Sequence, residues 1–210
     1  MKSPRRTYYA NFRLPEGLLG RYVVYRMNGK RHGTLAEWAL KDVQLNSDAS
    51  IADIGCGGGA NVARMLDKYP DSKVSGVDFS QVAINMALRV NKEAIAAGRC
   101  KIVGGNAKLL PLLKETHDLI TAFETVYYWP SFSECLSEIH RVLKSGGKVI
   151  IANETDGIDP EGHKWAKLVG HMRIYTIEEL TEYLTEAGFT DIKSRHDEER
   201  HFICVTGIKP

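Results

Sequence analysis

A glycine-rich run stands between a β-like segment and a helix-like segment, and its residue types suit the binding of a nucleotide-type cofactor. Residues 51–54 lead into positions 55–59, which hold four glycines and Cys56. Glycines at a strand-to-helix turn allow positive φ angles and let backbone N–H groups approach a ligand, which a Cβ atom would prevent. Asp53 precedes the glycines, and a carboxylate near a helix N-terminus repels a pyrophosphate but attracts an ammonium or sulfonium group. The run therefore favours S-adenosylmethionine over a dinucleotide.

Polar residues also end the next two β-like segments. Asp78 lies 23 residues after Gly55, where its carboxylate can accept hydrogen bonds from both ribose hydroxyls of an adenosine cofactor; the alternative is that Asp78 caps the following helix. The amide of Asn106 can bond an adenine edge, or Asn106 is a turn residue with a left-handed backbone. The alternative role of Ala107 is packing, without contact to a cofactor. The predicted cofactor-binding residues are Asp53, Gly55, Cys56, Gly57, Gly59, Asp78, Phe79, Asn106, Ala107 and Glu124.

Aromatic residues follow the fourth β-like segment, and they should face the reacting group because ligands of open α/β sheets lie outside the carboxyl ends of the strands. Tyr127, Tyr128 and Trp129 offer ring faces that attract a sulfonium or an amine and exclude water. They cannot all point inward, and each is alternatively an ordinary core or surface aromatic. Glu124 suits an ammonium group of the cofactor or an amine of the substrate; the alternative is a solvated strand end.

Histidines are the remaining candidates for acid–base chemistry. His32 and His163 are the two placed most plausibly near the site, as general bases, although a lone histidine is often a surface or structural residue. The predicted catalytic residues are therefore Tyr127, Tyr128, Glu124 and His32.

The segments that must position these residues alternate between β-like and helix-like patterns, which predicts a parallel sheet covered by helices. A first helix is expected over residues 33–45 with Thr34 as its N-cap, and a capping box begins the helix over residues 176–188. Two last strands, 189–195 and 201–208, read as an antiparallel hairpin. The other expected strands are 51–56, 73–79, 100–104, 117–123 and 148–153, and the other helices are 60–68, 81–97 and 132–144.

Length and charge predict one domain with a distinct N-terminal segment. The chain has 210 residues, of which 43% are hydrophobic, enough for one buried core. We assign residues 33–210 to a single α/β domain, with 155–175 as a possible substrate-side insertion. Residues 1–32 form a basic leader whose first 31 positions carry a net charge of +7, against −5 elsewhere. We favour a solvated, partly disordered leader over an arm that touches anionic substrate or RNA, with a lid as a further possibility.

Cysteine usage and hydropathy predict the environment of the protein. The four cysteines form no Cys-x-x-Cys pair, and no apolar run approaches the length of a membrane span. We therefore expect a reduced, cytoplasmic protein that is a monomer or a homodimer. Asp156, Asp159 and Glu161 form only a weak acidic cluster, so no metal is expected.

Three features together resemble the class I S-adenosylmethionine-dependent methyltransferases: the motif over residues 53–59, the motif over residues 76–80, and the terminal hairpin. The resemblance covers about residues 35–208. Residues 139–147 are similar to the small-molecule, methyltransferase type 11-like group related to ubiquinone and menaquinone methyltransferases, with Ser145 in place of its proline. That family usually has an aspartate where Asn106 stands, and its N-terminal helix can lie across the cofactor, which would bring Tyr22, Met27, Asn28 and His32 to the site.

The resemblance implies a Rossmann-like seven-stranded sheet, mostly parallel with an antiparallel last strand and with helices on both faces. It implies in-line transfer of a methyl group to a small-molecule acceptor, with S-adenosylhomocysteine as product. Alternatives are a non-catalytic protein that binds the cofactor, an RNA-directed methyltransferase that uses the basic leader, and an NAD-dependent oxidoreductase, which Asp53 and the hairpin disfavour. No Asn/Asp-Pro-Pro-Tyr/Phe run and no Pro-Cys dipeptide occurs, so we expect no DNA partner, and an RNA partner is disfavoured.

Overall fold

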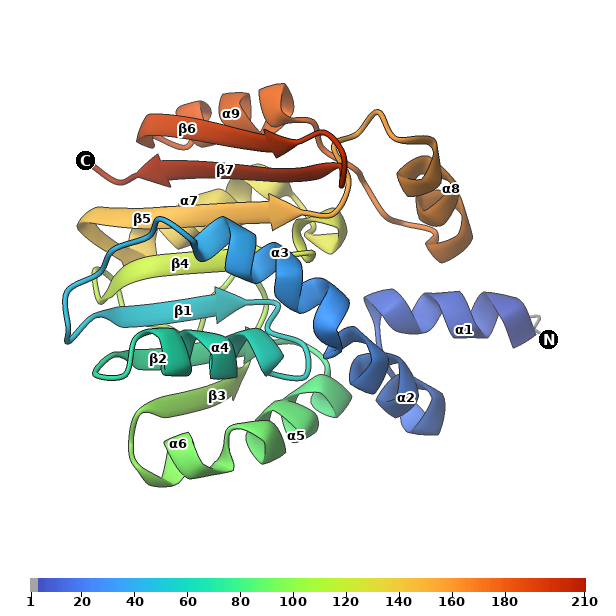
Figure 1. Ribbon diagram of the computed structural model, residues 1–210, viewed down its shortest axis with the longest axis horizontal. Coiled ribbons are helices and arrows are strands. Elements are labelled where there is room, and N and C mark those ends of the chain that lie inside the picture. The colour runs from blue at the N-terminus through green and yellow to red at the C-terminus, as the bar shows by residue number, and fades with distance from the viewer. Residues whose placement is uncertain (1–3) are drawn as a thin grey trace.

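One sheet of seven strands organises the chain, in the order β3-β2-β1-β4-β5-β7-β6 (Figure 1). The computed structural model describes residues 4–210, except for the side chains of 4–7 and 30–32. The pairs among β1 to β5 are parallel, and β7 runs antiparallel to both β5 and β6. This topology confirms the predicted fold class. The strands are β1 Ser50–Ile54, β2 Lys73–Asp78, β3 Cys100–Gly104, β4 His117–Phe123, β5 Leu143–Asn153, β6 Thr190–Asp197 and β7 Phe202–Ile208.

Helices cover both faces of the sheet, and a separate hydrophobic core lies under each set. Leu136, Ile139 and Leu180 from α7 and α9 belong to one core; Leu35 and Met65 from α3 and α4 belong to the other. Burial on both faces explains why the central strands are almost continuously apolar. The helices are α1 Pro4–Arg13, α2 Gly17–Met27, α3 Lys30–Leu40, α4 Ala60–Lys68, α5 Gln81–Val90, α6 Lys92–Ala96, α7 Phe132–Val142, α8 Pro160–Val169 and α9 Ile177–Glu186.

Two of the expected helices differ most from those observed. The first helix of the domain was expected to begin at Thr34, but α3 begins at Lys30 with Gly29 in the N-cap position, so Thr34 lies inside the helix. The expected helix over residues 81–97 is interrupted at Asn91, whose side-chain amide donates to the carbonyl oxygens of Gly59 and Ala87 at 3.1 and 3.0 Å. A side chain that bonds nearby backbone competes with the helix and ends it.

The N-terminal segment is helical and packed, which corrects the interpretation of a solvated, partly disordered leader. Helix α2 lies against α5, and Val23 and Val24 of α2 are buried. The turn between α1 and α2 is joined to the domain because the Ser80 hydroxyl donates to the carbonyl oxygen of Pro15 at 3.0 Å. The apolar face of α2 was too short to distinguish from the basic residues around it in the sequence. None of the described helices is long and apolar enough to cross a membrane.

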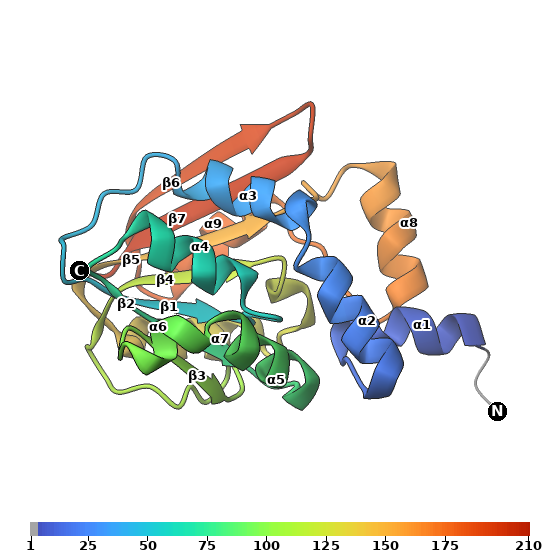
Figure 2. The ribbon, with the colours of Figure 1, turned by 60° about the horizontal axis from the view of Figure 1, so that its bottom comes forward.

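Helices α1 and α8, which lie far apart in the sequence, meet beyond the carboxyl ends of the parallel strands (Figure 2). Trp165 of α8 contacts two rings of α1: its ring centroid lies 4.9 Å from that of Phe12 and 5.6 Å from that of Tyr9, both edge to face. Helix α8 lies within residues 155–175, the segment assigned from the sequence to a substrate-side insertion, and Asp159 caps its first turn. The two helices therefore form one aromatic contact outside the sheet.

We expect Trp165→Ala to accelerate tryptic cleavage after Arg13 by at least about threefold, because local opening of α1 exposes the bond without global unfolding. Limited proteolysis followed by mass spectrometry measures the rate. Lys167→Ala is the matched control, since the Lys167 side chain is exposed on the same helix. Equal cleavage rates in the two variants would show that the contact with Trp165 does not hold α1 in place.

Candidate functional site

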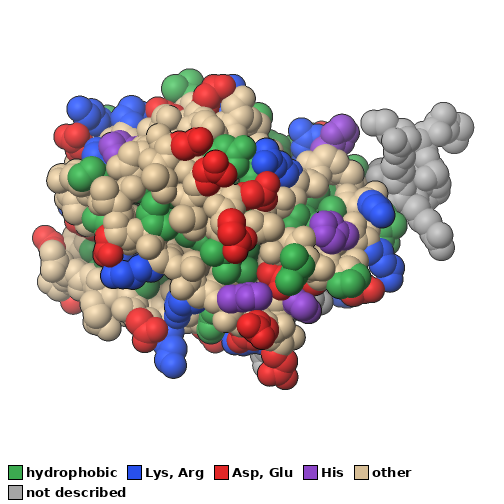
Figure 3. All heavy atoms as spheres, turned by 90° about the horizontal axis from the view of Figure 1, so that it is seen from above, with side chains coloured by type: hydrophobic (Ala, Val, Ile, Leu, Met, Phe, Trp, Pro, Cys, Tyr) green, Lys and Arg blue, Asp and Glu red, His purple; other side chains and the backbone are tan. Residues whose placement is uncertain are grey.

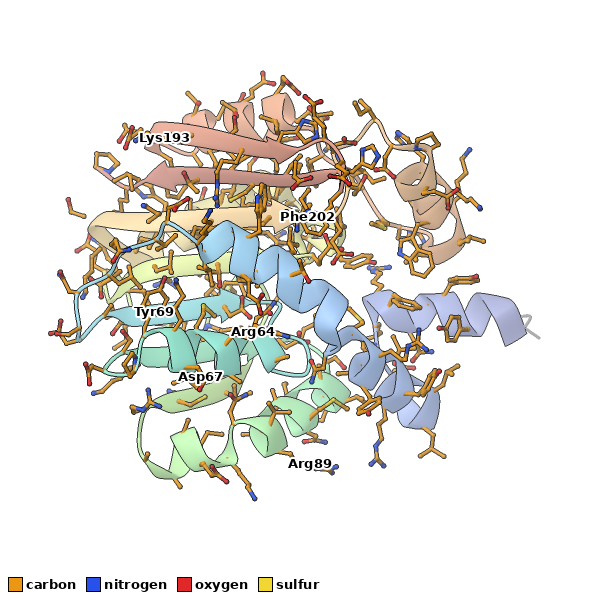
Figure 4. All side chains as sticks on the ribbon, viewed as in Figure 1. Arg64, Asp67, Tyr69, Arg89, Lys193 and Phe202 are labelled. Carbon is orange, nitrogen blue, oxygen red and sulfur yellow. The ribbon has the colours of Figure 1, made fainter. Side chains whose placement is uncertain are left out.

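A cavity of about 240 Å³ lies at the carboxyl ends of the central parallel strands. One wall comes from the glycine-rich loop after β1, the end of β2, the turn after β3 and the segment after β4. Arg64 of α4, labelled in Figure 4, also reaches it. The opposite wall comes from the N-terminal segment and consists of Phe12, Arg13, Pro15, Val24, Met27 and Asn28. The site is thus enclosed by the sheet edge on one side and by α1 and α2 on the other.

Positive φ angles shape the glycine-rich loop. Gly55, Gly57 and Gly59 have φ of 77°, 54° and 81°, values that L side chains rarely adopt. A Cβ on Gly55 would overlap the Thr125 side chain, and one on Gly58 would overlap Asn28. Gly55 and Gly57 line the cavity, whereas Gly59 lies behind its wall, where its carbonyl oxygen accepts from Asn91.

Cys56 is the one residue with a side chain among the first five positions of this loop, and it lines the cavity. Burial raises the pKa of the Cys56 thiol well above its usual value, and the carboxylates of Asp53 and Asp78 raise it further. A thiol held neutral is a weak nucleophile. Cys56 therefore acts as a small wall residue.

Asp78 connects the end of β2 to the glycine-rich loop. Its Oδ2 accepts from the N–H of Gly57 at 2.9 Å, and its Oδ1 accepts from the N–H of Ser80 at 2.8 Å. The helix-cap alternative does not hold, because Ser80 is the N-cap of α5 and accepts from the N–H of Ala83. Burial raises the pKa of Asp78, while these backbone hydrogen bonds lower it. Asp78 and the exposed ring of Phe79 both line the cavity.

Asp53 lies behind the cavity, not in its lining. The Asp53 side chain is 2% exposed, and its Oδ1 accepts from the Thr121 hydroxyl at 2.7 Å. Burial raises the pKa of Asp53 to about 7; the Thr121 hydrogen bond lowers it and the Asp78 charge raises it. Asp53 pairs with Thr121 across β1 and β4, so the two side chains lie on the same face of the sheet, where they bond each other. Asp53 was expected beside the ligand because its pairing with Thr121 cannot be seen in the sequence.

Asn106 and Ala107 form the turn after β3 and line the cavity. The Asn106 Oδ1 accepts from the N–H of Lys108 at 2.9 Å, so the side chain stabilises the turn, although the left-handed backbone of the alternative interpretation is absent. Ala107 is buried and also belongs to the core under α7 and α9.

The segment after β4 brings Glu124 and Tyr128 to the cavity, but Tyr127 does not line it. The Tyr127 hydroxyl donates to Glu124 Oε1 at 2.6 Å, and the N–H of Glu154 donates to the same oxygen. Burial raises the pKa of both tyrosines well above the usual value, so both phenols stay protonated near neutral pH. Glu124, with φ of 59°, is therefore held in place by a buried donor.

The histidines and acidic residues proposed from the sequence lie in several places. The His32 side chain is outside the described part of the structure. The His163 ring bonds the carbonyl oxygen of Gly157 at 2.8 Å, away from the cavity lining.

Asp156, from the weak acidic cluster, bonds His196 and His201 at 3.1 and 2.8 Å. Burial raises the pKa of Asp156, but these bonds and two backbone N–H groups hold it at about 2. Among the described residues no group of three or more His, Cys, Asp or Glu could hold a metal ion.

Sequence reasoning missed several residues of the site. Phe12, Arg13 and Thr125 all contribute to the wall but were not expected there. Asn28 also lines the cavity, and its amide donates to the carbonyl oxygen of Gly58 at 2.9 Å. Asn28 was anticipated only through the family resemblance. Tyr22, expected beside it, is half exposed and does not line the cavity. Arg13 is one of several arginines in the basic leader, and nothing in their spacing showed which of them would line the cavity.

Comparison with known proteins identifies similar sequences and folds. A family model described as "Methyltransferase domain" matches residues 52–151. The "Uncharacterized methyltransferase YdaC" of Bacillus subtilis is 24% identical over 179 residues, which cover 84% of this chain and 92% of that protein. A "Demethylmenaquinone methyltransferase" of Lactiplantibacillus plantarum is 30% identical over 122 residues, covering 56% of this chain and 52% of that protein. The chain spans less than two thirds of the length of several other curated relatives.

A similar fold occurs in a solved structure of a SAM-dependent methyltransferase from Aquifex aeolicus. The TM-score between the two is 0.75 with 18% identity, and the alignment covers 90% of this chain and 98% of that one. At this level of identity the likeness establishes the fold.

The buried carboxyl group of Asp53 should make stability fall with rising pH. Its pKa is about 7 in the folded chain, against an ordinary value of 3.8. Between these values the unfolded chain releases the proton and the folded chain keeps it, so the free energy of unfolding decreases as pH rises. We expect Asp53→Asn to reduce this decrease in urea denaturation between about pH 4 and pH 8. Asp67→Asn, at an exposed carboxylate of α4 (Figure 4), is the control; the same pH slope in both variants would contradict the prediction.

Gly55→Ala should weaken the binding of S-adenosylhomocysteine by at least about tenfold, because the new Cβ meets Thr125 and shifts the cavity wall. Gly98→Ala is the matched control: Gly98 has φ of 72° and open space around it, so it carries similar backbone strain of about 1 kcal/mol. Isothermal titration calorimetry gives both affinities. Loss of affinity in both variants alike would mean that strain, not the wall of this cavity, is responsible.

Proposed function

We propose that the chain is a class I S-adenosylmethionine-dependent methyltransferase and that it transfers the methyl group of this cofactor to a small-molecule acceptor by in-line displacement. The match to the methyltransferase family model and the similarity to curated methyltransferases support this proposal. The observation that carries the proposal is the hydrogen bond from the Gly57 N–H to Asp78, which joins the glycine-rich loop and the end of β2 in one cavity wall. A loop in which a Cβ on Gly55 or Gly58 would overlap a neighbouring side chain, with a buried carboxylate beside it, suits an adenosyl ligand.

The residues of the cavity fit the parts of this cofactor. Each oxygen of the Asp78 carboxylate accepts one backbone N–H, and a carboxylate has about four acceptor positions, so acceptor capacity is left for the ribose hydroxyls. Asn106 and the neighbouring Phe79 are assigned to the adenine, and the glycine-rich loop to the amino-acid part. When bound, the cofactor supplies an electrophilic methyl group.

The protein contributes alignment, exclusion of water and one oriented carboxylate. Displacement at a sulfonium disperses charge, so positioning of donor and acceptor is the main requirement. Glu124 is held by Tyr127 and by the N–H of Glu154 and attracts the ammonium of the cofactor or an amine of the acceptor. Tyr128 lines the cavity as a neutral phenol, so we assign it to packing or hydrogen bonding of the acceptor and not to proton abstraction.

We also propose a reduced, cytoplasmic location, which the four unpaired and buried cysteines support.

Asp78→Ala should weaken S-adenosylhomocysteine binding by more than about tenfold, since a buried polar contact to the ligand is lost. Calorimetry measures the affinity, and transfer of a labelled methyl group from S-adenosylmethionine to candidate acceptors measures turnover. Asp71→Ala, which removes an exposed carboxylate at the other end of β2, is the control. Unchanged affinity would remove Asp78 from the site, and binding of NADH in place of the adenosyl ligand would overturn the proposed function.

A further inference from the structure

A second hollow adjoins the cofactor cavity and shares part of its wall. Both are lined by Arg13, Tyr128, Trp129 and Pro130. The second hollow, here called the arginine groove, continues between the segment after β4 and the segment between α8 and α9, where His171 and Arg173 line it. A molecule seated in the arginine groove can therefore reach the cofactor cavity past Tyr128.

Rings form much of the wall of the arginine groove, and they hold one of its cations in place. The guanidinium carbon of Arg173 lies 4.6 Å from the ring centroid of Tyr175 and 5.6 Å from that of Tyr183. The N–H of Arg173 donates to the carbonyl oxygen of Tyr127 at 3.0 Å, which ties the groove to the segment beside the cavity. A guanidinium that is stacked in this way is pre-organised for a flat anionic group.

The charges of the groove leave a positive excess. Glu134 lines it but pairs with Lys108 at 2.8 Å. Arg173 pairs with Glu179 at 3.3 Å, and both side chains remain accessible. Arg13 is exposed and has no carboxylate partner among the described residues. An anion placed between Arg13 and Arg173 would therefore pair with Arg13 without displacing a carboxylate from it.

The surroundings favour a compact anion over a polyanion. The face of the molecule above α9 and β6 has acidic side chains over its middle (Figure 3), and Glu178, Glu182 and Glu186 of α9 are exposed. These carboxylates would repel an extended phosphate backbone near the groove. A small acid that fits within the groove would be repelled less by these carboxylates, because it does not extend over α9.

We propose that the methyl acceptor is an organic acid with an aromatic or other unsaturated body. Its anionic group binds in the arginine groove between Arg13 and Arg173, and its body lies against the rings on the way to the cofactor cavity. This inference rests on the proposed methyl transfer and adds the class of acceptor to it. The anionic group can be a carboxylate or a phosphate monoester, because both carry negative oxygens that accept hydrogen bonds from arginine.

The test uses the full chain saturated with S-adenosylhomocysteine, titrated with benzoate, phenyl phosphate and neutral benzyl alcohol and followed by two-dimensional NMR. We expect saturable binding of at least one of the two anions, weaker binding of benzyl alcohol, and loss of affinity at raised salt. Arg13→Gln and Arg173→Gln should each weaken the anion by at least about threefold. Arg89→Gln, at an exposed arginine of α5 outside the groove (Figure 4), should leave it unchanged.

The outcomes separate this inference from the proposed function. Absence of S-adenosylhomocysteine binding to the unaltered chain would overturn the methyl-transfer proposal itself. Normal binding of that ligand without binding of either anion, or with benzyl alcohol bound equally well, would overturn only the acid acceptor. A single-stranded RNA that binds more tightly than both anions and is weakened by the same two substitutions would replace the small acid with RNA. Preference between benzoate and phenyl phosphate identifies the anionic group.

Discussion

The carboxylate of Asp78 is the interaction on which the rest of the site depends, because it joins two turns that follow different strands. It accepts the Gly57 N–H from the turn after β1 and the Ser80 N–H from the turn after β2. Parallel strands place their carboxyl ends at one edge but do not by themselves fix the loops beyond them. A buried charge with two backbone donors fixes both loops and keeps a polar group at the cavity wall.

The N-terminal segment builds on this arrangement through polar contacts to the same turns. Asn28 donates to the carbonyl oxygen of Gly58, and Ser80, which caps α5, donates to that of Pro15. Gly58 is adjacent to Gly57, which donates to Asp78, and Ser80 itself donates to Asp78. The wall made by the N-terminal segment and the wall made by the turns after β1 and β2 are therefore joined by hydrogen bonds. The apolar face of α2 packs on α5 behind them.

Local patterns were sufficient to predict the sheet, but long-range pairing decided the details of the site. The ranges of β3 and β4 agree with the expected 100–104 and 117–123, since each is a short run with high strand propensity between turn residues. Asp53 could not be placed, because its direction depends on Thr121 in a strand far along the chain. Asn91, where the expected helix is interrupted, bonds Gly59, which lies far from it in the sequence. Helix α1 contacts Trp165 through Phe12, and no local pattern in the sequence connects these two residues.

The division of the cavity between two kinds of wall has a consequence for how such a protein can change over evolution. The wall beside the glycine-rich loop is part of the sheet and its buried core, where most substitutions disturb packing. The part of the opposite wall that α1 makes rests on ring contacts with α8, and the segment after α8, which lines the adjoining arginine groove, carries exposed side chains. Both lie outside that core, where substitutions usually cost little stability. New acceptors can therefore be accommodated by altering these outer segments while the cofactor-facing residues stay constant.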